Sequence, residues 1–518
     1  MEGASSWVVK RVSEIHAEGG DKTVAIILTK KEIKDGSANV SFLGHLANSK
    51  EFRQDLNLTN AYWNYNQETL KRVLVVQVTE VNRQELRKTG VKAAQELQAK
   101  KADNVEVIVS DAIDAELLGI FANSFYLTNY EFTSKTDPAT RDASLKETSS
   151  DEDFDPRSRK FTKKITNVVV SSKESANVLT DAKYAFWIAA ARGSEYARNV
   201  ANVRATIATP EFMEEQVRKL VEGKAQVKEV RVVKGQQLVD LGMNLLHAVG
   251  KGATTEPRCV AVYYKGNPEK DDVDVAFVGK GITFDTGGLH LKPYGGMEQM
   301  YLDKGGACSV IGALHGTLEL GIKMNVVFAM GLAENAIDAK SYKPMDILTS
   351  WKGYTVEIDN TDAEGRLILA DTFTYVQREF KPKRLIDLAT LTGAVRIALG
   401  LETAGLFSND DDFALEVANC GHEVFEKTWR LPIPDESKEQ TISPTADLVN
   451  SHKTPYGGSC RAAAFLEKFI EKDVKWIHLD IAGAFDHMTG AKAPLCINGN
   501  GFGVQTLLNY LYKTQQKS

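Results

Sequence analysis

The sequence predicts an α/β protein of two domains, a smaller N-terminal α/β domain and a larger C-terminal domain with a mixed, mostly parallel sheet flanked by helices. Its 518 residues are too many for one core, because single cores stop growing near about 250 to 300 residues. Strand-like apolar runs alternate with helical stretches along the chain, a pattern that favours parallel strands joined by right-handed crossovers. The composition, with 43% hydrophobic and 25% charged residues, is typical of soluble globular proteins.

The N-terminal domain is expected over residues 1–175. Its predicted strands are short apolar runs, TVAIILT from Thr23, VLVVQVT from Val73, VEVIVSD from Val105 and ITNVVVS from Ile165. A helix is expected from Arg83 to Lys101. Residues 133–159 are rich in charge, proline and serine and nearly lack apolar side chains, so they predict a mobile surface insertion.

A helical segment over residues 176–202 is predicted to link the domains, and the second domain is expected over residues 203–518. Its predicted strands are the apolar runs VDVAFVGKG, KMNVVFAMG, TVEIDN and RLIDLATLTG. Helices are expected from about Gly305 and from Arg366 to Phe380. Because ligands of such sheets gather where the strands end, polar residues directly after these strands are the candidates for chemistry.

Charge and hydropathy exclude several classes of protein. The 63 basic and 69 acidic residues give a net charge of -6, so nucleic acid is not an expected partner. The longest apolar runs have about ten residues, short of the roughly 18 that span a bilayer, and the N-terminus lacks the apolar run of a secretory signal. Five cysteines without a C-x-x-C pair predict a reducing compartment, the cytoplasm or, as the alternative, an organellar matrix.

The segment NTDAEGRL, residues 360–367, follows a predicted strand and concentrates charge. Asp362, Glu364 and Arg366 occupy alternate positions, so in extended backbone their side chains point to one side. Carboxylates brought together repel unless a positive charge lies between them, and a divalent metal often supplies that charge. The alternative is a surface cluster whose charges neutralise one another, and this segment alone leaves it open.

A second segment, VGKGITFDTGGLHLKPYGGMEQMYLDKGG, places charge at another strand end. Lys280 closes an apolar strand, Asp285 follows in a glycine-rich turn, and Lys292 and Asp303 come after it. A lysine at a buried strand end is costly unless it is paired or deprotonated, and a neutral amine can itself bind a metal. The two segments together predict a pair of divalent ions held by carboxylate oxygens and one amine.

These segments resemble the leucyl aminopeptidase (cytosol aminopeptidase) family, whose signature NTDAEGRL is present without change. LATLTGA from Leu388, GGSCRAAAFLEKFI from Gly457 and HLDIAG from His478 are similar to the family as well, so the resemblance covers about Leu241 to Tyr510. It implies that residues 203–518 form a catalytic metallopeptidase domain. This domain would remove leucine-like or other apolar residues from peptides with a free N-terminus, in a homohexamer.

The resemblance also implies how the charged residues share the metals. Two divalent ions per subunit, zinc, manganese, magnesium or cobalt, would be bridged by Asp285 and Glu364. Lys280 and Asp303 would complete the ligands of one ion, and Asp362 those of the other. Bridging carboxylates of this kind hold two metals close enough to act on one substrate.

Two catalytic residues and a substrate pocket are implied in the same way. Lys292 would stabilise the oxyanion of the reaction, and Arg366 would hold a bicarbonate that acts as the general base. The residues expected to contact the substrate are Met300, Asn360, Ala363, Thr390, Leu391, Gly393, Ala482 and Phe485. A pocket of this apolar, medium-sized kind suits leucine-like or methionine-like side chains.

The sequence departs from the family pattern in three places. Lys304 follows Asp303 where an apolar residue is usual. Cys460 and Arg461 stand where a threonine is common, and the segment NVANVRATIATPEF lacks the paired prolines often found at the start of the catalytic domain. None of these departures changes a predicted ligand.

Several other motifs and functions compete with this interpretation. HEVFE at His422 lacks a second histidine four positions after the first, so an exposed helix residue is expected. His478 and His487 are candidate ligands, but a structural role is favoured, and the GKG triplets at Lys251 and Lys280 lack the spacing of a P-loop. Two alternatives stay open: another binuclear hydrolase, such as a phosphoesterase, or a non-catalytic or moonlighting relative that acts as a scaffold or DNA-binding accessory.

Overall fold

The computed structural model divides the chain into two compact units, residues 1–191 with 492–496 and residues 192–491 with 497–518. The residues that it describes are 8–9, 23–29, 61–66, 71–102, 104–110, 113–132, 167–171, 181–487 and 492–517. The insertion expected at residues 133–159 lies outside them. Helix α7 (Ala182–Asn202) contains the boundary between the units.

The first unit is built on a six-stranded sheet with the order β1-β6-β5-β2-β4-β3. Its strands are β1 (Val8–Val9), β2 (Thr23–Thr29), β3 (Ala61–Asn66), β4 (Lys71–Val78), β5 (Asn104–Val109) and β6 (Asn167–Ser171). Neighbouring strands are parallel except at the edge, where β3 is antiparallel to β4. Strands β2, β4, β5 and β6 lie at the four predicted apolar runs.

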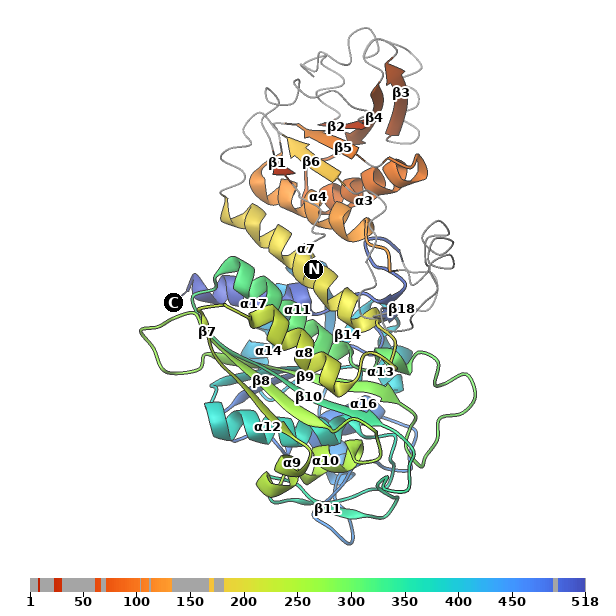
Figure 1. Cartoon of the computed structure of the whole chain (residues 1–518), viewed down its shortest axis with the longest axis vertical. Coiled ribbons are helices and arrows are strands. Elements are labelled where there is room, and N and C mark those ends of the chain that lie inside the picture. The colour runs from red at the N-terminus through yellow and green to blue at the C-terminus, as the bar shows by residue number, and fades with distance from the viewer. Residues whose placement is uncertain are drawn as a thin grey trace, which may run out of the picture. The chain divides into compact units, whose positions relative to one another are not determined.

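Helices α3 (Arg83–Ala99) and α4 (Ala115–Thr128) pack against each other beside this sheet (Figure 1). Each helix begins at a capping side chain: Asn82 accepts a hydrogen bond from the backbone N–H of Glu85, and Asp114 from that of Leu117, both at 2.9 Å. Such caps satisfy backbone donors that the first turn leaves free. Gly90 allows the close packing, because a Cβ there would lie 2.2 Å from Ser124 Oγ.

The second unit is built on an eight-stranded sheet with the order β15-β14-β17-β13-β9-β10-β8-β7. Its strands are β7 (Val227–Lys234), β8 (Arg258–Lys265), β9 (Val275–Asp285), β10 (Asn325–Asn335), β13 (Arg384–Ala389), β14 (Thr403–Ser408), β15 (Lys427–Arg430) and β17 (Lys475–Asp480). The four central strands β17, β13, β9 and β10 are parallel, whereas β7, β8 and β14 pair antiparallel with a neighbour. This sheet confirms the predicted mixed, mostly parallel arrangement.

Helices cover both faces of the large sheet, as Figure 1 shows. One face carries α8 (Pro210–Val221), α11 (Gly305–Leu320), α14 (Asp411–Glu423) and α17 (Val504–Gln515). The other carries α9 (Gln236–Leu241), α10 (Asn244–Gly250), α12 (Gly365–Phe380) and α16 (Gly458–Glu467). Because both faces are covered, the central strands are apolar along nearly their whole length and do not alternate.

Short elements complete the second unit near the ends of the strands. They are the 3-10 turn η4 (Met300–Leu302), the helices α13 (Gly393–Leu399) and α15 (Asp435–Glu439), a small sheet of β11 (Ile347–Thr349), β12 (Thr355–Glu357) and β16 (Leu448–Val449), and the pair β18 (Asp486–His487) and β19 (Asn498–Gly499). Parallel β9, β10 and β13 end at the same edge of the large sheet. The residues that follow them are therefore brought together there.

All five cysteines are free thiols, three of them buried. Among the residues that the structure describes, none of the helices is both long and apolar enough to cross a membrane.

Glu426 makes the stability of the second unit depend on pH. Its carboxylate is buried and accepts hydrogen bonds from the backbone N–H and the hydroxyl of Thr506, at 2.8 and 2.6 Å. Burial raises the pKa of Glu426 from 4.5 to about 7, although the bonds from Thr506 oppose the shift. The unfolded chain therefore loses this proton first as the pH rises, so the stabilisation is complete below pH 4.5 and is lost by about pH 7.

Glu426→Gln should therefore gain free energy of unfolding relative to the wild type as the pH is raised from about 4.5 to about 8. The expected gain is roughly 3 kcal/mol, because each pKa unit corresponds to about 1.4 kcal/mol. Urea unfolding of both proteins at the two pH values measures it. A difference between the two proteins that does not change with pH would contradict the assignment.

Candidate metal centre

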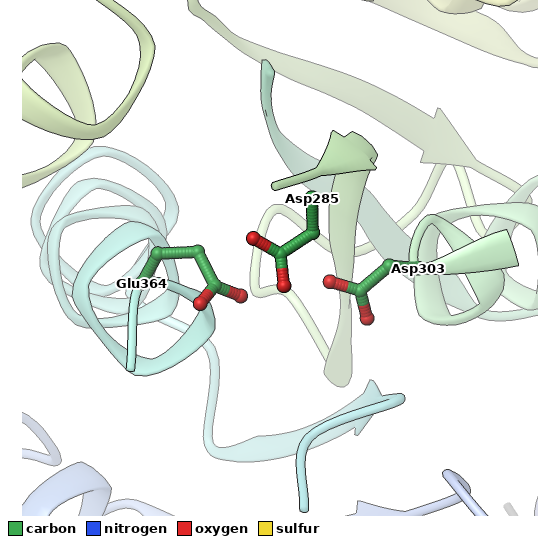
Figure 2. Close-up of side chains that lie close together, drawn as sticks. All are labelled: Asp285, Asp303 and Glu364. Atoms are coloured by element: carbon green, nitrogen blue, oxygen red, sulfur yellow. The ribbon is translucent and has the colours of Figure 1, made fainter. Parts of the chain in front are cut away.

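Three buried carboxylates meet at the edge of the large sheet. Asp285 is the last residue of β9, Asp303 follows η4, and Glu364 directly precedes α12. One oxygen of each carboxylate lies within 4.8 Å of the others. Figure 2 shows the three groups turned toward one another. Of the four acids predicted from the sequence, the structure thus brings these three into one cluster.

A bulge in β9 puts Lys280 and Asp285 on the same side. The two residues are five positions apart, so in a regular strand their side chains would point to opposite faces. The pairing of β9 with β10 shifts by one residue between Ile282 and Asp285, where three steps along β9 oppose two along β10. One extra residue in a strand turns every later side chain to the other face, and Asp285 consequently joins Lys280.

Two lysines hold the carboxylates together. Lys280 Nζ lies 2.8 Å from Asp303 Oδ1 and 3.0 Å from Glu364 Oε1. Lys292 Nζ lies 2.7 Å from Asp285 Oδ2 and also contacts Asp362, whose side chain is 34% exposed. Asp362 is therefore joined to the cluster through Lys292 and stands nearer to solvent than the other three acids.

Neighbouring backbone and polar groups fix these side chains. Asn335, the last residue of β10, donates a hydrogen bond of 2.8 Å to Asp285 Oδ1, and Gly287 N donates another of 2.9 Å. Thr390 accepts from Lys280 Nζ through its carbonyl at 2.9 Å, and its hydroxyl donates to Asp303 Oδ1 at 2.7 Å. A side chain at position 365 would displace Lys280, because a Cβ on Gly365 would lie 2.7 Å from Lys280 Nζ.

The cluster has the donor set and the charge that suit a divalent cation. Asp303 Oδ2 and Glu364 Oε2 are buried and have no hydrogen-bond partner among the described residues. The ion-paired group contains four carboxyl groups and two ammonium groups, so when all of them are ionised it carries an excess of two negative charges. Hard divalent ions prefer such carboxylate oxygens, and the residues therefore fit the metal that the sequence predicts.

The electrostatics of the cluster shift the pKa values of its ionisable groups. Burial raises the pKa values of Asp303 and Glu364 to about 7. Burial also lowers the pKa of Lys280, but the carboxylates of Asp303, Glu364 and Asp285 together raise it by more, so its net shift is upward. Lys280 is thus an ammonium in the protein without metal. To bind a metal as the predicted neutral amine it must release its proton, which couples metal affinity to pH.

A cavity of about 430 Å³ opens beside the cluster. The predicted substrate residues that line it are Met300, Asn360, Ala363, Thr390, Leu391, Gly393 and Ala482. Phe485 is fully buried instead and packs near Gly305, where a Cβ would lie 2.7 Å from its ring. The lining also contains polar residues that the sequence analysis did not include, Gln299, Thr392, Arg396, Ser451 and Asp486. Single polar residues of this kind carry no local pattern that would reveal them in the sequence.

Arg366 lines the same cavity. Its Nη1 donates a hydrogen bond of 2.8 Å to Asn450 O, and its buried Nε finds no partner in the described part of the chain. Burial lowers its pKa to about 10, so the guanidinium keeps its charge at neutral pH. The group is therefore fixed at one end and can bind an anion.

The two charged departures from the family pattern donate hydrogen bonds to backbone carbonyls. Lys304 is fully buried and donates to the carbonyls of Val203, at 3.1 Å, and Tyr301. Burial lowers its pKa to about 8. Arg461 lines the cavity and donates to Thr454 O at 2.8 Å. Neither residue contacts a predicted ligand through a hydrogen bond or ion pair that the structure records.

The histidines that competed for a metal role lie elsewhere. His478 is fully buried in β17, with Nδ1 2.7 Å from Asp387 Oδ1 on the neighbouring strand. His422 is an exposed residue of α14, as expected. The side chain of His487 is not among those described.

Acids, lysines and a cavity lie together at the carboxyl ends of the central strands. This arrangement defines the protein as an α/β enzyme with a candidate metal centre. The chain belongs to the cytosol aminopeptidase family, because the model of that family's catalytic domain matches residues 195–508, more than half of its length.

Relatives and solved structures agree with this family. The chain is 45% identical over 296 residues to a probable cytosol aminopeptidase of Tolumonas auensis, covering 57% of this chain and 58% of that protein. It is 41% identical over 332 residues to one of Aquifex aeolicus, covering 62% and 64%. The alignments thus span less than two thirds of these curated relatives.

The similarity of structure extends over nearly the whole chain. The bottromycin maturation enzyme BotP, in complex with Mn, matches with a TM-score of 0.78 and 28% identity over 96% of this chain and all of that one. A mutant of tomato leucine aminopeptidase matches with a TM-score of 0.78 and 26% identity over 98% and 96% of the two chains.

Proposed function

We propose that the protein is a metal-dependent aminopeptidase that removes single residues from the N-termini of peptides. The observation that carries the proposal is the buried cluster of Asp285, Asp303 and Glu364, whose oxygens lie within 4.8 Å of one another beside a cavity. Membership of the cytosol aminopeptidase family supports the reaction type. We assign the chemistry to a catalytic domain over residues 203–518.

We assign the cluster to two divalent ions per chain. Asp285 and Glu364 would bridge them, Lys280 and Asp303 would complete one ligand set, and Asp362 the other. The two unpartnered buried oxygens of Asp303 and Glu364 support this assignment. The manganese in the related BotP structure supports a divalent metal, and zinc, magnesium and cobalt suit the same ligands.

Bound ions of this kind supply Lewis acidity, which polarises a peptide carbonyl and lowers the pKa of water. Lys292 would stabilise the negative charge that develops on the carbonyl oxygen. Burial lowers the pKa of Lys292, but Asp285, Glu364 and Asp362 together raise it by more, so the ammonium keeps the proton that it would donate. Arg366, held by Asn450, would position bicarbonate, which supplies the general base.

The cavity would receive the first side chain of the peptide. Met300, Ala363, Gly393 and Ala482 supply the apolar part of its lining, which supports a preference for leucine-like residues. The α-amine of the peptide would lie at the acidic cluster, so an unblocked N-terminus is required. A homohexamer in the cytoplasm is the assembly that we propose from the family membership alone.

Chelation followed by stepwise addition of metal tests this function. The full chain, dialysed against a chelator, should lose hydrolysis of leucine p-nitroanilide and regain it as Mn²⁺, Zn²⁺, Mg²⁺ or Co²⁺ is added up to two ions per chain. N-acetyl-leucine p-nitroanilide should not be cleaved. Hydrolysis of a phosphate ester without hydrolysis of the anilide would favour a phosphoesterase, and full anilide hydrolysis after chelation would overturn the metal mechanism.

A further inference from the structure

Asp480, the last residue of β17, is a buried carboxylate with no place in the proposed reaction. It is fully shielded from solvent. Its Oδ1 accepts hydrogen bonds from the backbone N–H groups of Leu391 at 3.2 Å, Thr392 at 3.4 Å and Ala482 at 3.2 Å. Its Oδ2 accepts from the Thr392 hydroxyl at 2.6 Å. Both oxygens are therefore used to hold backbone and side chain of the turn at residues 390–392.

This turn follows β13, the strand beside β17, and contacts the metal centre. Strands β13 and β17 are parallel, with Ala389 paired to Asp480, so the turn that follows β13 begins beside Asp480. The first residue of the turn, Thr390, holds Lys280 through its carbonyl and Asp303 through its hydroxyl. Residues 390–392 thus include donors to Asp480 as well as the residue that contacts the predicted ligands Lys280 and Asp303.

The neighbours of Asp480 make the turn rigid. The Thr392 hydroxyl also lies 2.8 Å from Ser459 Oγ, on α16, and accepts a bond from Val395 N at the start of α13. A buried carboxylate that accepts several hydrogen bonds strongly favours one geometry, because each buried donor left without a partner costs about 1–3 kcal/mol. The turn therefore has little freedom to shift while Asp480 is in place.

We propose that Asp480 is a positioning residue for the metal centre, which it serves by fixing the 390–392 turn and, through Thr390, the side chains of Lys280 and Asp303. The inference rests on the proposed function, because it concerns the ligands of one proposed ion. Replacing a residue that orients metal ligands without contacting the metal typically changes metal affinity or activity by about 10- to 100-fold.

Asp480→Asn in the full-length chain tests the proposal, with Mn²⁺ alone as the probe. The affinity for Mn²⁺, measured by calorimetric titration, should fall about 10- to 100-fold. Backbone amide exchange at Leu391, Thr392 and Ala482 should become faster. Thr392→Val removes the donor to Asp480 Oδ2 and should also weaken Mn²⁺ binding. Thr392→Ser keeps the hydroxyl and should bind Mn²⁺ as the wild type does.

Asp371→Asn is the matched control for loss of a buried carboxylate. Asp371 is also fully buried, and it accepts hydrogen bonds from the backbone N–H groups of Leu245, Leu246 and Trp351 at 2.8, 3.0 and 2.9 Å. None of these residues contacts a predicted ligand through a recorded hydrogen bond. This variant should lower the melting temperature and leave the affinity for Mn²⁺ within about twofold of the wild type.

The outcomes separate this inference from the proposed function. A wild-type chain that binds no Mn²⁺ overturns the metal centre and the role of Asp480 with it. Tight binding by the wild type that Asp480→Asn and Thr392→Val both preserve overturns only the role of Asp480. An equal loss in Asp480→Asn and Asp371→Asn also overturns it, because the effect would then follow stability. If Asp480→Asn does not fold, the comparison of Thr392→Val with Thr392→Ser decides.

Discussion

Lys292→Ala is expected to lower the turnover of leucine p-nitroanilide by about 100- to 1,000-fold, because it removes a charge that stabilises the developing oxyanion. The same change should leave the metal content of the protein unaltered. Lys292 lies between Asp285 and Asp362, and both carboxylates stay available to a cation when the ammonium is gone. Measurement of kcat together with metal analysis of the purified variant tests both parts.

A second lysine provides the control for this experiment. The side chain of Lys352 is 15% exposed and ion-paired to Glu471 at 3.4 Å, much as that of Lys292 is 14% exposed and ion-paired. Lys352→Ala removes a similar charge away from the cavity, so it should leave turnover unchanged. Turnover that stays within about twofold of the wild type in Lys292→Ala would remove Lys292 from the mechanism.

Asp285→Ala is expected to abolish tight binding of divalent metal altogether. Asp285 is assigned to both ions, and its loss leaves Asp303 and Glu364 joined mainly to Lys280. Activity should fall with the metal and should not return at high metal concentration. Metal analysis after gel filtration and an activity titration with Mn²⁺ measure the two effects.

Folding must be separated from metal loss in this variant. Glu426→Gln replaces another buried, hydrogen-bonded carboxylate of the same unit, and it should retain the full metal content. A circular dichroism spectrum like that of the wild type would show that Asp285→Ala is folded. Two metals per chain retained by folded Asp285→Ala would disprove the bridging role.

The sequence was sufficient to predict the fold where local pattern decides it. Apolar runs buried on both faces marked β9, β10 and β13, and α12 begins within one residue of the predicted start. The bulge of β9 could not be predicted, because it depends on how β9 pairs with β10 and not on the residues of β9 alone. Residues 133–159 stay a prediction, since they lie outside the described part.

Local sequence pattern also predicted part of the candidate site, and it failed where side chains from distant segments act together. Asp285, Asp303 and Glu364 follow strands or precede helices, and the structure gathers them. Asn335 and Asp480 escaped notice, because each is a single polar residue at the end of an apolar strand and acts through a partner distant in the sequence. The exposed position of Asp362 likewise depends on tertiary packing.

The extra residue of β9 makes the site depend on how two strands pair. Lys280 and Asp285 share a side only because β9 has one more residue than β10 between Ile282 and Asp285. If the same five positions paired with β10 in regular register, the carboxylate of Asp285 would face away from Lys280. Such a chain would still contain every acid, both lysines and the unchanged NTDAEGRL signature, yet it could not assemble the cluster. The strand pairing at residues 282–285 is therefore as much a part of the site as the identities of its residues.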